Sequence, residues 1–263
     1  MSVSIEDRAP GAETLLSWKS IVLVMAIAVV TVAAGTLAGY AATALFDIWS
    51  GTDAPRAYAA GEIQSLQTAR VSVSFFAFQT VTILTLIAVN ALLGRGDGNG
   101  RFLNFAMPRG GLKTLILASL GLMLLAFLYG SLIFALDREA FRHDMSPFAE
   151  LMKARTWWLV LIAAGIGAPI AEECLFRGLM FGTLKRTSLG IGGAAAVSAI
   201  LWALLHANYS IYGVTAITLI GIYLALVRER TGSLLTPIVC HGAYNSLIVL
   251  VLAFAPNSSL VTG

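Results

Sequence analysis

The chain has 263 residues, of which 58% are hydrophobic and only 12% carry a charge. Soluble domains carry about 25% charged residues, so this composition excludes an ordinary soluble domain and indicates a membrane protein with several spans. The net charge of +3 is what basic cytoplasmic loops supply in such proteins, and it gives no ground for nucleic-acid binding.

Seven apolar segments are candidates for membrane spans, each of which needs about 20 residues. The segment 187–227 lacks Asp, Glu, Lys and Arg but is too long for one helix, and "HANYSIYG" at 206–213 is its natural break. It therefore supplies two short spans. The other five are Ser20–Phe46, Val71–Leu93, Thr114–Leu136, Trp157 to about Gly182, and Ser233–Ala255. The pattern predicts an all-α polytopic membrane bundle with about seven transmembrane helices.

Two polar stretches, "GRGDGNGR" at 94–101 and "DREAFRHD" at 137–144, are expected as loops, with His143 exposed to solvent. We expect four regions along the chain. They are a cytoplasmic tail (1–19), a three-helix membrane region (20–156), a catalytic core (157–255) and a C-terminal tail (256–263).

The distribution of Lys and Arg predicts a cytoplasmic N-terminus. With that orientation, ten of the 17 Lys and Arg residues lie in inside segments and six in outside loops, and only Arg177 lies within a span. The first twenty residues mix acidic and basic side chains and do not resemble a cleavable signal peptide. Because the chain is short, has basic loops and shows no organellar targeting signal, we expect a multi-pass protein of a bacterial inner membrane.

The fourth span is interrupted by charges in "PIAEECLFRGLMFG" at 169–182. A charge at bilayer depth costs at least about 2.5–3.5 kcal/mol, so something must offset the cost of Glu172, Glu173 and Arg177. Glu173 and Arg177 are four residues apart and share a helix face, where they can pair. Glu172 lies about 100° around the helix and has no obvious cation.

Polar groups on two later helices lie at similar depth. Counted at 1.5 Å per residue from the expected helix ends, Glu172 lies roughly 20 Å in and His206 roughly 18 Å in. His241 and Asn245 lie roughly 12 and 18 Å in, and they share a face because they are four residues apart. The same spacing puts the ring of Trp202 beside His206. A common depth indicates one site.

A glutamate and two histidines can activate water for hydrolysis. Glu172 can act as the base directly, since an acid buried without a cation suits that role, or His206 and His241 can hold a metal ion. Asn245 can donate a hydrogen bond to a developing oxyanion. Inside a membrane, the expected scissile bond is a peptide bond.

These motifs carry a resemblance to a known family. "EECLFR" (172–177) reads as EExxxR, "WALLH" (202–206) as an aromatic residue followed by His, and "HGAYN" (241–245) as HxxxN. In this order, they resemble the three motifs of the CPBP intramembrane proteases. That family unites CAAX prenyl endopeptidases with bacteriocin-processing and self-immunity proteins, also called the Abi family. The resemblance covers about a third of the chain, and Trp202 stands where the family often has phenylalanine.

The resemblance implies an intramembrane endopeptidase with a water-filled cavity among its late helices. Its substrate is expected to be a membrane-associated protein or peptide, with the lipid bilayer as surroundings and no nucleic acid. Glu172 would activate water, His206 would assist it or bind metal, and His241 and Asn245 would complete the oxyanion or metal side.

Glu173 and Arg177 would support this site. Members are named metalloproteases, yet the same residues suit a metal-free glutamic mechanism, and the chain has no HExxH zinc motif. Whether His206, His241 and Glu172 hold Zn²⁺ is therefore open.

Four alternatives use the same residues. A proton-coupled transporter would more often show matching polar positions in both halves of the chain, which this sequence lacks. A haem protein could use His206 and His241 as axial ligands but leaves Glu172 unexplained. Cys174 or Cys240 could act as a nucleophile, although a thiol in apolar surroundings is a poor one. A non-catalytic immunity or scaffold protein would not depend on the acid at Glu172.

Overall fold

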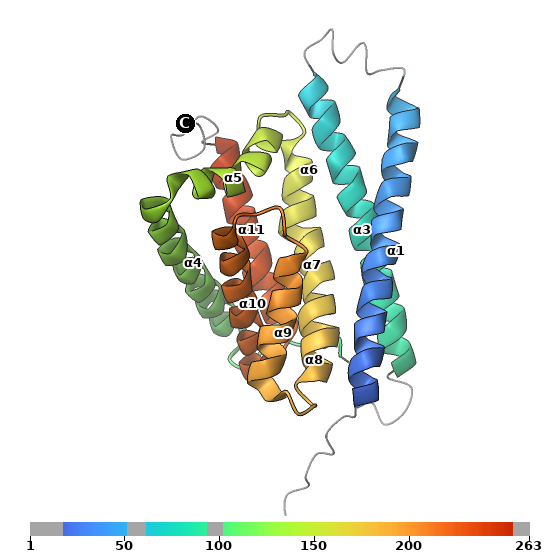
Figure 1. The fold of residues 1–263 in the computed structure, drawn as a ribbon, viewed down its shortest axis with the longest axis vertical. Coiled ribbons are helices and arrows are strands. Elements are labelled where there is room, and N and C mark those ends of the chain that lie inside the picture. The colour runs from blue at the N-terminus through green and yellow to red at the C-terminus, as the bar shows by residue number, and fades with distance from the viewer. Residues whose placement is uncertain (1–17, 52–61, 94–101, 255–263) are drawn as a thin grey trace, which may run out of the picture.

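The computed structural model describes residues 18–51, 62–93 and 102–254, which form helices joined by turns and short connections. The helices stand side by side as a bundle (Figure 1). Six are long and apolar enough to cross a membrane: α1 (Trp18–Ser50), α3 (Ile63–Leu93), α4 (Gly111–Leu136), the helix Trp157–Leu184, α10 (Ile211–Thr231) and α11 (Leu235–Phe254). The predicted all-helical membrane bundle is thus confirmed.

The fifth predicted span is α9 (Gly190–Leu204), and it is shorter than a span. Its 15 residues extend roughly 22 Å, whereas the hydrocarbon core of a bilayer is about 30 Å thick. The chain turns back at 205–210, close to the predicted break, and enters α10. This turn therefore lies within the depth of the bundle rather than beyond its end, as the loop between α9 and α10 shows in Figure 1.

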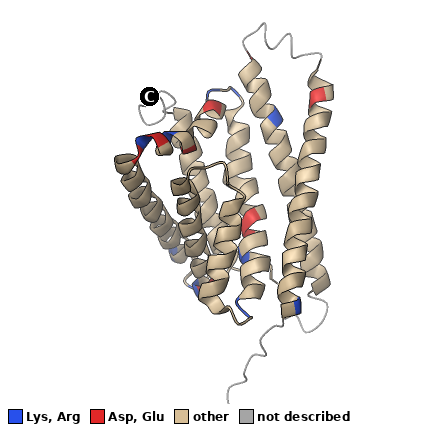
Figure 2. Cartoon of the chain, viewed as in Figure 1, with Lys and Arg blue, Asp and Glu red and all other residues tan. Residues whose placement is uncertain are grey.

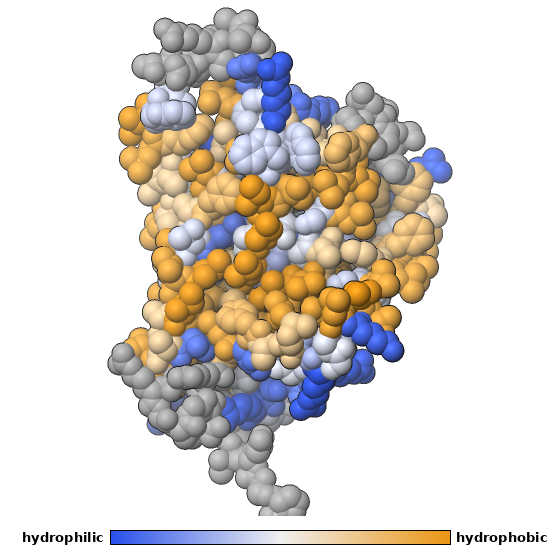
Figure 3. Space-filling model, turned by 180° about the vertical axis from the view of Figure 1, so that it is seen from behind, coloured by the Kyte–Doolittle hydropathy of each residue, from blue (hydrophilic) through white to orange (hydrophobic). Residues whose placement is uncertain are grey.

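The surface agrees with a multi-pass membrane protein. Figure 2 places most charged positions near the two ends of the helices, with a few at mid-height on the helix of α7. The rear face in Figure 3 shows a broad apolar belt between hydrophilic ends. The tails predicted at 1–19 and 256–263 and the loop predicted at 94–101 lie outside the described residues, apart from Trp18 and Lys19.

The first two spans are longer than their apolar sequences indicate. α1 continues through Asp47 and α3 begins before Arg70. The Arg70 guanidinium donates two hydrogen bonds to the Asp47 carboxylate, at 2.6 and 2.8 Å. The helices that form thus include charged residues beyond the apolar segments predicted as spans. This pair lies near the end of the helices, with both side chains about half exposed.

The stretch 137–144, expected as a loop, begins a helix instead. α5 (Arg138–Met152) starts at Asp137, whose side chain accepts a hydrogen bond from the backbone N–H of Ala140 at 2.9 Å. An aspartate at this position satisfies one of the free N–H groups of the first turn, so a polar run can still form a helix. α5 lies across one end of the bundle, beside α4, α6, α10 and α11 (Figure 1).

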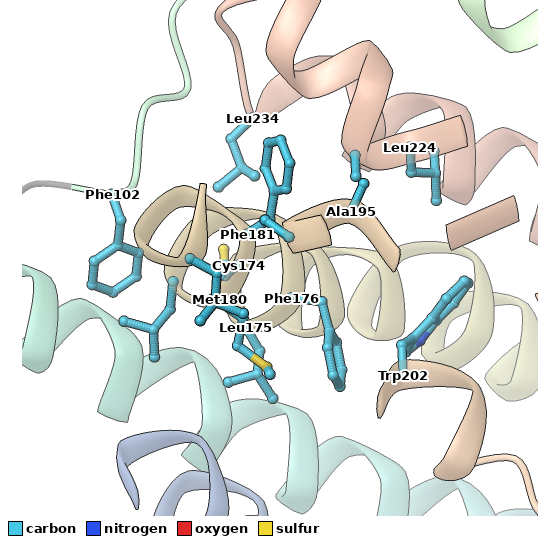
Figure 4. Packing of buried hydrophobic residues seen from close by; sticks show 14 of the residues in the cluster. Phe102, Cys174, Leu175, Phe176, Met180, Phe181, Ala195, Trp202, Leu224 and Leu234 are labelled. Atoms are coloured by element: carbon cyan, nitrogen blue, oxygen red, sulfur yellow. The ribbon is translucent and has the colours of Figure 1, made fainter. Parts of the chain in front are cut away.

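The helix Trp157–Leu184 carries the core of the protein. It consists of α6 (Trp157–Ile162), the π-helical turn η1 (Ala163–Gly167), α7 (Ala168–Glu173), the π-helical turn η2 (Cys174–Met180) and α8 (Phe181–Leu184). All seven residues of η2 are buried. Side chains of neighbouring segments, among them Phe102, Ala195, Trp202, Leu224 and Leu234, surround it (Figure 4). The two glutamates thus sit on a helix that is held on several sides.

Candidate active site

The π-helical turn η1 prepares a backbone acceptor for Asn245. In such a turn, each carbonyl accepts from the N–H five residues later, and Ala168 donates to Ala163 in this way. The corresponding donor for Ala164 would be Pro169, which has no N–H. The Asn245 side chain on α11 donates to the Ala164 carbonyl instead, at 2.9 Å. Pro169 and the wide turn therefore position Asn245.

Glu173 is the centre of a buried charged group. Both Glu173 and Arg177 are fully buried, and Arg177 Nη1 donates to Glu173 Oε1 at 3.0 Å. The same oxygen receives a hydrogen bond from His241 Nδ1 at 2.9 Å. The carboxylate thus offsets the charge of Arg177 and also fixes a histidine from another helix. Because Glu173 is fully buried, it is poorly placed to activate water.

Trp202 on α9 connects the members of the site. The Arg177 guanidinium lies 4.4 Å above its ring, a cation–π contact. The rings of His206 and His241 contact it edge-on, with ring centroids 5.6 and 5.3 Å from that of Trp202. Its indole Nε1 donates to Glu172 Oε2 at 2.6 Å. Trp202 is therefore a structural centre of the site, whereas the sequence indicated only that its ring lies beside His206.

Glu172 differs from its neighbour in exposure and in partners. Its side chain is half-buried, while that of Glu173 is fully buried. The indole N–H of Trp202 orients one carboxylate oxygen, and the other forms no hydrogen bond with a described residue. Glu173 Oε2 also forms no hydrogen bond with a described residue, but it is buried. Glu172 is therefore the acid whose free oxygen water or substrate can reach.

His206 lies in the turn after α9, and its ring is oriented by the backbone. Nδ1 lies 3.1 Å from the Trp202 carbonyl oxygen, which can only accept, so Nδ1 carries the proton. Nε2 then has a lone pair and bonds to no described residue. The ring of Tyr209 contacts that of His206, with ring centroids 5.9 Å apart.

His241 has both ring nitrogens engaged. Nδ1 donates to Glu173, so the neutral ring accepts at Nε2, where Asn245 Nδ2 lies at 3.0 Å. Asn245 thus uses its amide hydrogens on His241 and on the Ala164 carbonyl.

This arrangement does not fit a zinc ion. A catalytic zinc site needs about three protein ligands, and His241 has no free nitrogen. Within the described residues, no three His, Cys, Asp or Glu side chains gather as a metal-ligand group. His206 Nε2 and one oxygen of Glu172 are the donors left of the expected set. We therefore derive no step through a metal.

Two glycines allow α11 to approach the helix Trp157–Leu184 closely enough for these bonds. A Cβ atom on Gly242 would lie 2.8 Å from the carbonyl oxygen of Gly165, closer than real Cβ contacts. The neighbouring His241 reaches Glu173 because of this contact. Beside it, the two helices line an apolar groove of about 300 Å³.

Sequence reasoning missed two polar residues that hold the site. Gln79 on α3 is buried, and its Nε2 donates to the Ala163 carbonyl at 2.9 Å. Asp144 on α5 is also buried and accepts from the backbone N–H and the hydroxyl of Ser210, at 2.6 and 2.7 Å. Ser210 is the N-cap of α10 and closes the turn that carries His206. His143 is mostly exposed, as expected.

Comparison with known proteins bears on the same helices. Residues 154–247 match the family described as type II CAAX prenyl endopeptidase Rce1-like. This range contains all three motifs. Residues 154–247 are thus similar to an Rce1-like domain. The resemblance to the CPBP proteases, drawn from EExxxR, the aromatic residue with His, and HxxxN, is confirmed for this domain.

Two curated relatives share parts of the chain. The "Putative membrane peptidase YdiL" of Bacillus subtilis is 29% identical over 120 residues, which are 45% of this chain and 46% of that protein. An "Uncharacterized 24.3 kDa protein" of Escherichia coli is 31% identical over 94 residues, 35% of this chain and 43% of that protein. The matched stretches thus span less than half of each relative. No solved structure matches the chain. The Rce1-like domain and the peptidase relative support a membrane protease.

Proposed function

We propose that this protein is an intramembrane endopeptidase that cleaves a peptide bond of a membrane-associated protein or peptide, with Glu172 as the base that activates water. The observation that carries the proposal is the contrast between two adjacent acids. Glu173 is fully buried and accepts hydrogen bonds from Arg177 and His241. Glu172 is half-buried, oriented by Trp202, and has an oxygen to spare.

In the proposed reaction, the oxygen of a water molecule attacks the carbonyl carbon of the scissile bond while Glu172 accepts a proton from that water. His206 assists, because its Nε2 lone pair can accept a hydrogen bond or a proton beside the Trp202 ring. The tetrahedral intermediate then collapses, the C–N bond breaks, and the proton from the water passes to the leaving amine. Glu172 and His206 thus share the transfer of one proton from water to the leaving amine.

The negative charge on the carbonyl oxygen of the intermediate needs donors. We assign this role to Asn245 and His241, supported by Glu173 and Arg177. Because the Asn245 amide is engaged with His241 and with the Ala164 carbonyl, one of those bonds must open when substrate binds. Protonation of His241 would open it, since its Nε2 would then be a donor and could no longer accept from Asn245.

The cysteine alternative gains no support from the geometry. Cys174 and Cys240 are both buried and free, and Cys240 Sγ accepts a long hydrogen bond from Ser119 at 3.6 Å. A nucleophilic thiol needs access to substrate and a neighbouring base.

Three expectations from the sequence remain predictions. They are the bound zinc ion, the location in a bacterial inner membrane and the cytoplasmic N-terminus.

A comparison of membrane-proteome N- and C-termini tests the proposed function. A bacterial host would carry wild type, Glu172→Gln or Glu139→Gln at matched expression; Glu139 is an exposed glutamate on α5 and serves as the control. We expect new termini with wild type and Glu139→Gln but not with Glu172→Gln. Growth with a membrane-permeant zinc chelator forms a separate arm, in which loss of the termini would favour a metal. Identical termini in all strains, with folded variants, would favour an immunity, scaffold or transport role.

A further inference from the structure

A second cavity lies far along the chain from the motifs, where α4 begins and α10 ends. Its volume is about 420 Å³, and its lining includes Arg109, Leu117, Ala118, Val227 and Arg230. Thr114 and Thr231 complete it, and each hydroxyl is already bonded to a backbone carbonyl. The cavity thus combines two cationic side chains with an apolar wall.

The surrounding backbone holds this cavity in shape. The segment before α4 is joined to the turn between α10 and α11 by four hydrogen bonds. Arg109 N–H donates to Thr231 O at 3.4 Å, and Leu234 N–H donates to Asn104 O at 2.7 Å. The Asn104 side chain donates to Gly232 O at 2.9 Å, and the Ser233 hydroxyl donates to Ala106 O. The two arginines are therefore carried by segments fixed to each other.

The charges of the cavity are not neutralised by the described part of the protein. Both arginines are exposed, and neither forms an ion pair with a described residue. The acid nearest in sequence, Glu229, is engaged by Lys185 at 2.5 Å. No Asp or Glu is among the lining residues. Two guanidinium groups that face one cavity without a carboxylate favour an anion with several oxygens, such as a phosphate.

The apolar wall indicates where that phosphate comes from. Leu117, Ala118 and Val227 lie on membrane-spanning helices, one or two turns inside the ends where the arginines stand. A free phosphate would leave this wall uncovered, whereas a phospholipid would place its acyl chain there and its phosphate between the arginines. Basic pockets between transmembrane helices bind lipid headgroups in this way.

We propose that the cavity lined by Arg109 and Arg230 binds the phosphate of an anionic phospholipid at the membrane boundary. The site lies outside the catalytic residues and does not depend on the proposed protease activity. It is expected on the side of the membrane that the Lys and Arg distribution assigns to the cytoplasm.

Thermal unfolding of purified protein in detergent micelles tests this proposal. Phosphatidylglycerol, phosphatidylcholine with the same acyl chains, or inorganic phosphate would be titrated, and the melting temperature recorded. The test variant is Arg109→Gln/Arg230→Gln. The control, Lys19→Gln/Lys113→Gln, removes two exposed lysines from the first turns of α1 and α4, outside the cavity.

We expect phosphatidylglycerol to raise the melting temperature of wild type and of the control at lower concentration than phosphatidylcholine does. The test variant should need roughly 30-fold more phosphatidylglycerol for the same shift. An equal response of test and control variants would overturn the proposal. If only inorganic phosphate raises the melting temperature, and the test variant loses this effect, the ligand is a free anion and the lipid proposal is overturned. Single substitutions, each with a smaller effect, replace the double variant if it does not fold.

Discussion

The indole Nε1 of Trp202 donates a 2.6 Å hydrogen bond to Oε2 of Glu172, joining α9 to α7 across 30 residues of sequence. This bond fixes which way the half-buried carboxylate points. The same ring packs against Arg177, His206 and His241, so one side chain aligns the acid with the rest of the site.

Trp202→Phe should lower turnover with a small change in stability. Phenylalanine keeps an aromatic ring for Arg177 and the histidines but removes the N–H that orients Glu172. Misplacing a catalytic group by about 1 Å can cost roughly 100-fold in rate, so we expect a 10- to 100-fold fall in kcat. Turnover of a substrate peptide in nanodiscs measures this, with Trp158→Phe, at a half-exposed tryptophan, as control. Unchanged kcat would show that the bond does not position Glu172.

Glu173→Gln should destabilise the protein strongly. The substitution leaves the buried Arg177 without its carboxylate, and breaking a buried pair from one side costs about 3–5 kcal/mol. Reversible unfolding in mixed detergent micelles measures the free energy of unfolding. Glu150→Gln breaks the exposed pair with Lys153 and should cost less than about 1 kcal/mol. Equal costs for the two variants would contradict the assigned structural role of Glu173.

Asp144→Asn should reduce activity through the turn that carries His206. The two donors of Ser210 bond to different oxygens of Asp144, and asparagine has an NH2 group in place of one of them. One acceptor is therefore lost, and the start of α10 and the turn before it loosen. We expect kcat to fall roughly 10-fold with KM little changed. If the two residues act together, Ser210→Ala should add little to Asp144→Asn, because coupled residues give non-additive effects. Full additivity would indicate separate roles.

Gly242→Ala should force α11 away from the helix Trp157–Leu184. The new Cβ would meet the Gly165 carbonyl oxygen at 2.8 Å, and such overpacking costs about 1–3 kcal/mol. Turnover should fall as well, because the shift lengthens the bond between His241 and Glu173. Gly192→Ala is the matched control, since its Cβ meets no atom within 4 Å. Wild-type stability and turnover in Gly242→Ala would contradict the close contact.

Spacing along one helix predicted part of this site. Glu173 and Arg177 share a face at a separation of four residues, and the structure pairs them. His241 and Asn245 have the same spacing and also contact each other. The apolar pattern predicted every helix of the described chain that is long enough to cross a membrane. It missed α5, which begins in polar sequence at the cap Asp137, and it did not show that α1 runs on to include Asp47.

Contacts between helices could not be predicted from one sequence. Spacing within a helix does not say that Glu173 also binds His241, which lies 68 residues away. The π-helical turns η1 and η2 change which residues face the site, and in η1 backbone carbonyls accept hydrogen bonds from side chains of other helices. The residue pattern did not predict these turns. Gln79 lies in a predicted span and Asp144 in a predicted loop, and neither assignment indicates that the side chain packs onto the site.

The central claim is that Glu172 activates water, and purified protein in nanodiscs tests it most directly. A peptide that spans a cleavage position found in the proteome comparison would be incubated with wild type, Glu172→Gln or Glu139→Gln. We predict that Glu172→Gln folds as wild type does, binds the peptide, and cleaves it at least roughly 100-fold more slowly, as expected when a general base is lost. Cleavage by Glu172→Gln at the wild-type rate would contradict the account.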